Sequence, residues 1–204
     1  MRLIFLCLLF ISAKAFAGSS QFGTGITFHL GLGYGGAQIV NPDGTKANYK
    51  ALGMKGGAQL PLFEGGNFAS HLVGGLQYLD LQNNANSGRQ SEIANMIGPS
   101  AGLKLRAFKF FVEYDYSFML ARHYAIGTIS RSSKYNMPVG TMSAGITYPL
   151  KQLTVSFAYS QSSGTVPKAS SELSKSSPYT DQVYWLQLSY STGSSLRQFF
   201  SFLF

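Results

Sequence analysis

The chain has 204 residues and a formal net charge of +8; only 12% of its residues are charged, while 14% are aromatic and 23 are glycine. Charge this sparse is unusual for a water-soluble surface, where about a quarter of the residues are commonly charged. The length fits one domain, and no shift in composition marks an internal boundary.

Residues 1–17 predict a cleaved secretory signal peptide. Arg2 gives a basic start, residues 3–11 form an apolar run, and Ala15-Phe16-Ala17 provides an A-x-A cleavage site. The run is far shorter than the about 20 apolar residues that a membrane-spanning helix needs. Cleavage would remove Cys7, the single cysteine, so we expect neither a disulfide nor a thiol ligand in the mature protein.

The residues after the signal peptide predict eight extended segments in which apolar and polar side chains alternate, as they do on the two faces of a β-strand. The segments lie at about residues 24–36, 48–62, 71–79, 97–107, 108–120, 141–148, 153–160 and 184–191. Gly74 and Gly75 interrupt the alternation of the third segment, so its facing is left open.

Segment 108–120 shows the alternation most clearly. One face carries only apolar and aromatic residues, namely Phe108, Phe110, Val112, Tyr114, Tyr116, Phe118 and Leu120. The other face carries Lys109, Phe111, Glu113, Asp115, Ser117 and Met119. A strand between lipid and a polar lumen requires this division. A soluble sandwich would instead bury the apolar face, and one strand alone does not decide between the two.

Connections between the segments are alternately short and long. The short ones are residues 63–68, 107–109 and 149–152, and the long, polar ones are residues 37–47, 82–94, 121–137 and 164–181. Short periplasmic turns and long outer loops are the rule in outer-membrane barrels, and only a closed sheet satisfies its backbone in lipid. We therefore predict an all-β, antiparallel up-and-down transmembrane barrel with both ends in the periplasm.

This pattern resembles the small eight-stranded barrels of the bacterial outer membrane, such as the OmpA transmembrane domain and OmpX, over residues 18–192. Phe200, Phe202 and Phe204 resemble the terminal aromatic motif that the barrel assembly machinery recognises, which makes that machinery an expected partner. In the family the motif ends the last strand. Here it follows an apparent break, so residues 193–204 are either an extension of the last strand or an interfacial tail.

Five charged residues have inward parity on neighbouring predicted strands: Lys55, Lys104, Arg106, Glu113 and Asp115. The interior of an eight-stranded barrel is only wide enough to be filled by side chains. An unpaired buried ion costs several kcal/mol, so we expect a polar network that plugs the lumen. The alternative is a gate or narrow ion path in which Arg106 and Glu113 exchange partners.

The third long connection holds Arg122, Arg131 and Lys134 without a carboxylate. Such a cluster could pair with lipopolysaccharide phosphates at the outer leaflet, or it could simply be solvated. Outer-membrane lipid and lipopolysaccharide are thus expected partners, and an extracellular partner of the loops is possible in principle. A secreted chain with no recognition element gives no support to nucleic-acid binding.

The three histidines were considered as sites of chemistry. His29 and His71 are too scattered for a metal site, and we expect them in the lumen or at the interface. His123, with Ser130 and nearby serines, could support acyl transfer, because some barrels of this family modify lipid A. Inward parity of His123 and the lack of an H-x-S run argue against catalysis.

These observations predict a non-enzymatic outer-membrane barrel with a polar, plugged lumen and no cofactor. Its role would be envelope integrity or surface contact through its outer loops. The first alternative is a narrow ion channel, and the second is a lipid A-modifying acyl hydrolase or transferase.

Overall fold

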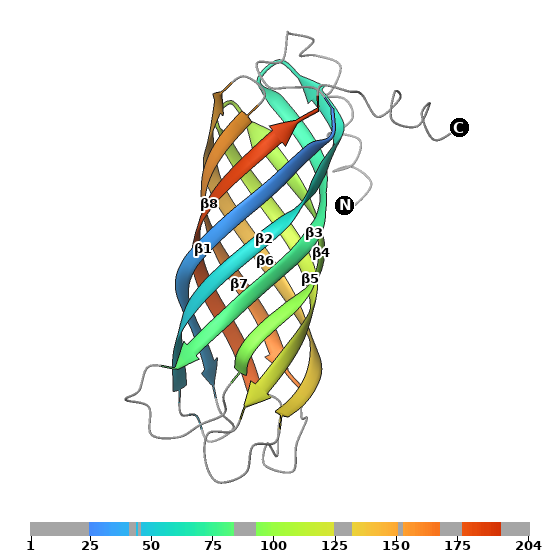
Figure 1. Ribbon diagram of the computed structural model, residues 1–204. Coiled ribbons are helices and arrows are strands. Elements are labelled where there is room, and N and C mark those ends of the chain that lie inside the picture. Colours follow the sequence, from blue (N-terminus) through green and yellow to red (C-terminus); the bar gives the residue numbers. More distant parts are fainter. Residues whose placement is uncertain are drawn as a thin grey trace, which may run out of the picture.

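Eight antiparallel strands close into one barrel in the computed structural model (Figure 1). The structure describes residues 25–40, 44, 46–83, 93–124, 132–150, 153–167 and 177–192. The strands are β1 (Thr27–Val40), β2 (Lys46–Gly65), β3 (Phe68–Asn83), β4 (Ile93–Ala107), β5 (Phe110–Tyr124), β6 (Ser132–Leu150), β7 (Leu153–Val166) and β8 (Ser177–Ser191). No helix among these residues is long and apolar enough to cross a membrane.

Each strand pairs with its neighbours in the sequence, and β1 closes the ring against β8, with Thr27 opposite Ser191. The first and last strand ends therefore lie at one end of the barrel, together with the connections at 66–67, 108–109 and 151–152. We call this the turn end. The connections at 41–45, 84–92, 125–131 and 167–176 lie at the opposite loop end.

The strands extend further toward the loop end than the sequence predicted. β6, for example, begins at Ser132, within the predicted loop 121–137, and β1 continues to Val40. The predicted strand limits were wrong there because the outward face becomes polar: Lys50, Arg122, Asn136 and Gln182 are exposed. The structure gives the facing of the third strand, which the sequence left open. Leu72 and Leu76 are exposed, and the alternation passes through Gly74 and Gly75 unbroken.

An apolar belt surrounds the barrel from the turn end to beyond its middle. On β1 the belt comprises Phe28, Leu30, Leu32 and Tyr34, of which Leu30 is 72% exposed. The other strands contribute Leu52, Met54, Leu72, Leu76, Leu103, Val112, Tyr114, Phe118, Met142, Phe157, Tyr184, Leu186 and Leu188. A closed sheet with an apolar exterior is the structure that a lipid environment requires of β-strands.

The interior has two halves of opposite character. Toward the turn end the buried residues are polar or charged, including His29, Gln59, His71, Lys104 and Arg106. Toward the loop end a continuous apolar cluster fills the barrel: Ile39, Tyr49, Leu79, Leu81, Met96, Met119, Met137, Val139, Val166, Tyr179 and Val183. We call this cluster the loop-end plug. The expected polar lumen is therefore present mainly in the turn half.

Candidate functional site in the barrel interior

Glu113 is the centre of the buried charge cluster. Lys55 reaches it across the lumen from β2, with 3.4 Å between Nζ and Oε1, although β2 and β5 are not neighbours in the sheet. Lys104 lies directly opposite Glu113 in the β4–β5 register and places its Nζ 3.8 Å from Oε2. One carboxylate is thus shared by two ammonium groups, which ties three strands together inside the barrel.

The predicted exchange between Arg106 and Glu113 does not match this arrangement. Arg106 lies opposite Phe111, one inward position closer to the turn end than Lys104. On its other side, Arg106 lies opposite Ala69 of β3, and Ala69 lies opposite Glu64 of β2. The ion-pair partners that the structure gives Glu113 are Lys55 and Lys104. Asp115, the fifth predicted member, is buried on the same face of β5, where its carboxyl packs over Gly102.

Trp185 forms the opposite wall of the charge cluster. The Nζ of Lys55 lies 5.0 Å from its ring centroid, a cation–π geometry. The indole lies over Gly33 and Gly53, where an added Cβ would come within 2.8 Å and 2.5 Å of the ring. Its Nε1 donates a hydrogen bond of 2.8 Å to the Oγ of Ser160. The glycines are needed here because only their missing side chains leave room for the ring.

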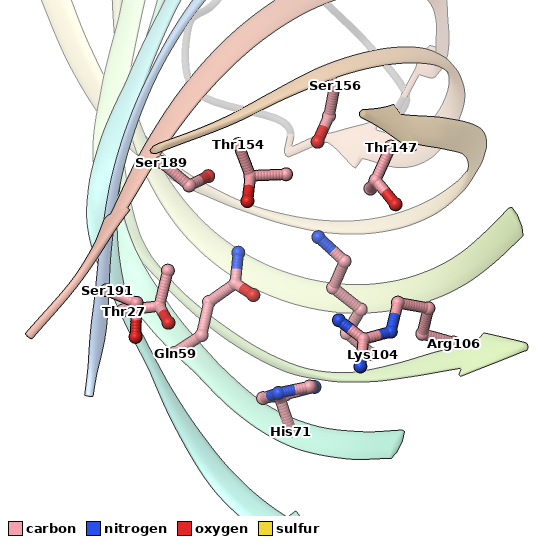
Figure 2. Close-up of a pocket in the computed structure, with 10 residues that line it drawn as sticks. All are labelled: Thr27, Gln59, His71, Lys104, Arg106, Thr147, Thr154, Ser156, Ser189 and Ser191. Carbon is pink, nitrogen blue, oxygen red and sulfur yellow. The ribbon is translucent and has the colours of Figure 1, made fainter. Parts of the chain in front are cut away.

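A pocket lies at the turn end of the lumen, lined by Thr27, Gln59, His71, Lys104, Arg106, Thr147, Thr154, Ser156, Ser189 and Ser191. Figure 2 shows its nitrogen-bearing side chains, from β2, β3 and β4, facing hydroxyl groups from β6, β7 and β8. Its free volume of about 40 Å³ leaves room for a few water molecules. His71 is fixed at its wall by Glu64, with 3.1 Å between Nε2 and Oε1.

The loop-end plug contains one polar pair. The hydroxyl of buried Tyr179 donates a hydrogen bond of 2.7 Å to Oδ2 of Asp181, and Asp181 is also buried. Next to them, Thr141 donates a hydrogen bond of 3.0 Å to Ser162, which lies opposite Asp181 in the β7–β8 register. The row ties β6, β7 and β8 together where the surrounding interior is apolar.

The remaining predicted sites are described only in part. Arg122 is exposed and lies directly opposite Lys134 in the β5–β6 register, and His123 lies opposite Ser133. The side chains of Lys134, His123 and Ser133 lie outside the described part of the structure. So do all of Arg131, the predicted signal peptide and the segment 193–204 with Phe200, Phe202 and Phe204.

Sequence reasoning missed three of these features. Trp185 was assigned no role, His71 was expected in the lumen or at the interface without a partner, and Glu64 was placed in a short turn. A signal for the Trp185 site was present: an inward tryptophan on one strand faces inward glycines on the two strands that follow it around the ring. No group of three or more His, Cys, Asp or Glu that could hold a metal ion occurs among the described residues.

No protein-family model matches the chain, and no curated protein matches it significantly. Among solved structures it is similar to the neisserial surface protein A, with a TM-score of 0.52 at 11% identity, covering 84% of this chain and 99% of that one. This likeness shows the fold, and it confirms the predicted fold class, an eight-stranded barrel of the outer-membrane type.

Two further solved structures are similar at lower scores. One is Ail, the attachment invasion locus protein of Yersinia pestis, in complex with the heparin analogue sucrose octasulfate: TM-score 0.43, 12% identity, 81% of this chain and 99% of that one. The other is the outer-membrane protease OmpT from Escherichia coli, with a TM-score of 0.39 at 13% identity, covering 86% of this chain and 99% of that one.

Proposed function

We propose that this protein is a non-enzymatic, non-conducting barrel of the bacterial outer membrane that makes surface contacts through its loop end. Its turn end would face the periplasm and its loops the exterior, as in barrels with short periplasmic turns. The observation that carries the proposal is the reversal of polarity beyond the apolar belt. There the exterior is polar, with Lys50, Arg122 and Gln182 exposed, while the interior is the apolar plug.

This reversal supports a rigid platform more than a pore. A strand that leaves the lipid needs a polar exterior, and an apolar interior gives the protruding sheet a core of its own. Met96, Met119 and Met137, each at most 1% exposed, help to fill the cross-section that ions would have to pass. The platform would hold the four loops in fixed positions, which is useful for contact with a partner and of no use for conduction.

The absence of conductance is the first prediction. Purified protein inserted into planar bilayers is expected to give no single-channel steps, because an ion would meet the dry plug beyond the charge cluster. Opening the plug with Met119→Ser and Met137→Ser together should admit water and raise the current above the baseline. Steady steps from the wild-type protein that change with Lys104→Met would instead favour the channel.

The surface role is tested by exchanging loops while keeping the barrel. Residues 84–92, 125–131 and 167–176 are replaced by Gly-Ser segments of equal length, and the adhesion of intact cells to immobilised host matrix is measured. We expect adhesion to fall to the level of cells without the protein, at equal amounts of folded barrel. If the loop-exchanged protein retains adhesion and also restores the detergent resistance of deletion cells, envelope integrity is the better assignment.

We also propose that Arg122 and Lys134 contact lipopolysaccharide phosphates. Two like charges directly opposite each other in an antiparallel pair are destabilising, and an anion bound between them relieves this. Arg122→Gln is expected to weaken lipopolysaccharide binding by about 1 kcal/mol, about fivefold. The measurement is lipopolysaccharide retention on the immobilised barrel, compared with Lys50→Gln, an exposed lysine that lies opposite Gly36 and Gln82. Equal losses in both variants would show only diffuse charge attraction.

A further inference from the structure

The turn-end pocket concentrates hydrogen-bond donors. Lys104 brings an ammonium group, Arg106 a guanidinium and Gln59 an amide, and hydroxyl groups from other strands face them across the space (Figure 2). The residues that line the pocket include two basic side chains, Lys104 and Arg106, and no carboxylate. A buried space of this composition favours an occupant that carries negative charge and several acceptor oxygens.

Three carboxyl groups lie near the two basic side chains without lining the pocket: Glu113 and Asp115 near Lys104, and Glu64 near Arg106. Glu113 is already bound by Lys55 at 3.4 Å, and its 3.8 Å separation from the Lys104 ammonium is longer than a hydrogen bond. Lys104 also lies 4.1 Å over the centroid of the Phe111 ring, which contributes only partial negative charge. The Lys104 ammonium therefore lines the pocket without a hydrogen bond to Glu113, and it can donate hydrogen bonds to an occupant of the pocket.

The pocket wall contains buried polar atoms without a protein hydrogen-bond partner. They include Nδ1 of His71 and Oγ of Ser191. An unsatisfied buried polar group is costly, so an occupant that forms hydrogen bonds with these atoms would stabilise the wall. Glu64 lies 3.1 Å from the other ring nitrogen of His71 and so fixes the imidazole in the wall.

The size and position of the pocket further restrict the kind of anion that can bind. A free volume of about 40 Å³ admits a small anion and excludes a larger organic ligand. The lining side chains lie on the inner face of the sheet, and several, such as Thr27 and Ser191, are at the strand ends that form the turn end. The occupant would thus enter from the solution at that end, and the lipid-facing surface gives no access to it.

We propose that the turn-end pocket is a binding site for a soluble phosphate group, either inorganic phosphate or a small phosphate ester. Arg106 provides the planar donors that match a tetrahedral oxyanion, Lys104 provides the second charge, and the hydroxyls of Ser156 and Ser191 complete the shell. This site is independent of the surface contact proposed above, because it lies at the opposite end of the barrel.

The test uses the refolded full chain in a zwitterionic detergent. Sodium phosphate is titrated against sodium chloride at equal ionic strength, and binding is followed by the thermal midpoint and by line broadening in phosphorus NMR. Phosphate is expected to raise the midpoint saturably and chloride to leave it unchanged. Arg106→Gln and Lys104→Met should each weaken the apparent affinity at least about tenfold, since each removes a charged donor. Ser191→Ala gives a milder variant of the same pocket if a charge variant does not fold.

Lys109→Gln is the matched control. Lys109 lies outside the pocket, with its ammonium 5.7 Å from the ring centroid of Tyr148, and its loss should leave phosphate binding unchanged. Equal effects of phosphate and chloride, or equal losses in Lys109→Gln and Arg106→Gln, would overturn the proposal. A response to phosphatidylglycerol micelles without a response to inorganic phosphate would also overturn it, because the anion would then be a lipid headgroup.

Discussion

Glu113→Ala is expected to lower the free energy of unfolding by about 3–5 kcal/mol, the usual cost of removing one partner from a buried ion pair. The carboxylate balances Lys55 and Lys104, whose side chains are 11% and 6% exposed. Without it, two buried ammonium groups would lose the ion-pair partner that they share, and Asp115 would be the carboxyl group left near them. The measurement is urea unfolding in lipid vesicles, followed by tryptophan fluorescence and by heat-modifiable migration on gels.

A triple variant tests whether stability can be rescued. In the triple variant Glu113→Ala, Lys55→Met and Lys104→Met, the two ammonium groups without their ion-pair partner are gone, and most of the lost stability should return because an apolar replacement of a buried ion pair is often neutral. Asp80→Asn, on the outward face of β3, is the matched control and should change stability by less than about 0.5 kcal/mol. A loss below about 1 kcal/mol in Glu113→Ala would mean that water, rather than Glu113, solvates the two lysines.

How far the sequence predicts this cluster depends on register. The period of a strand is two, so inward parity alone placed Lys55, Lys104 and Glu113 in the lumen. It did not rank their distances, so the expected network had no assigned pairs and the alternative of a gate paired Arg106 with Glu113. The turn at 108–109 would have decided it, because counting back from Ala107 opposite Phe110 puts Lys104 opposite Glu113. The cross-lumen contact of Lys55 needs the closed ring as well, since β2 and β5 share no ladder.

The alternation of apolar and polar residues did not predict the loop-end plug. A spanning strand was taken to end where its outward face ceased to be apolar, so the polar residues beyond that point were assigned to loops. Ile39 and Met137 therefore lay in predicted loops and not in a predicted strand. In the structure the strands continue with reversed polarity, apolar inward and polar outward, as in a soluble barrel. Following the paired residues once around the ring from His29 leads back to β1 at Ile39. Only this register of all the strand pairs brings these residues to one level of the barrel.

Trp185→Ala is expected to be nearly as damaging as the loss of Glu113, at about 3–5 kcal/mol. The ring fills the space above Gly33 and Gly53, which have no side chains to move into the cavity that it would leave. The hydrogen bond to Ser160 and the contact with the Lys55 ammonium are lost at the same time. Tyr184→Ala removes a neighbouring aromatic that is 66% exposed on the outer face, and a loss well below that of Trp185→Ala is expected.

A double-mutant cycle distinguishes the loss of packing between Trp185 and Gly53 from a general sensitivity of β8 to substitution. Gly53→Ala alone should cost about 1–3 kcal/mol, because its methyl group would lie 2.5 Å from the Trp185 ring. In the Trp185→Ala background the same methyl group enters the cavity, so the second substitution should cost little or even restore stability. Unfolding is followed by circular dichroism, since Trp185 is the single tryptophan of the chain. Strictly additive losses would show that the ring does not rest on Gly53, and the role given to the inward glycines would fail with it.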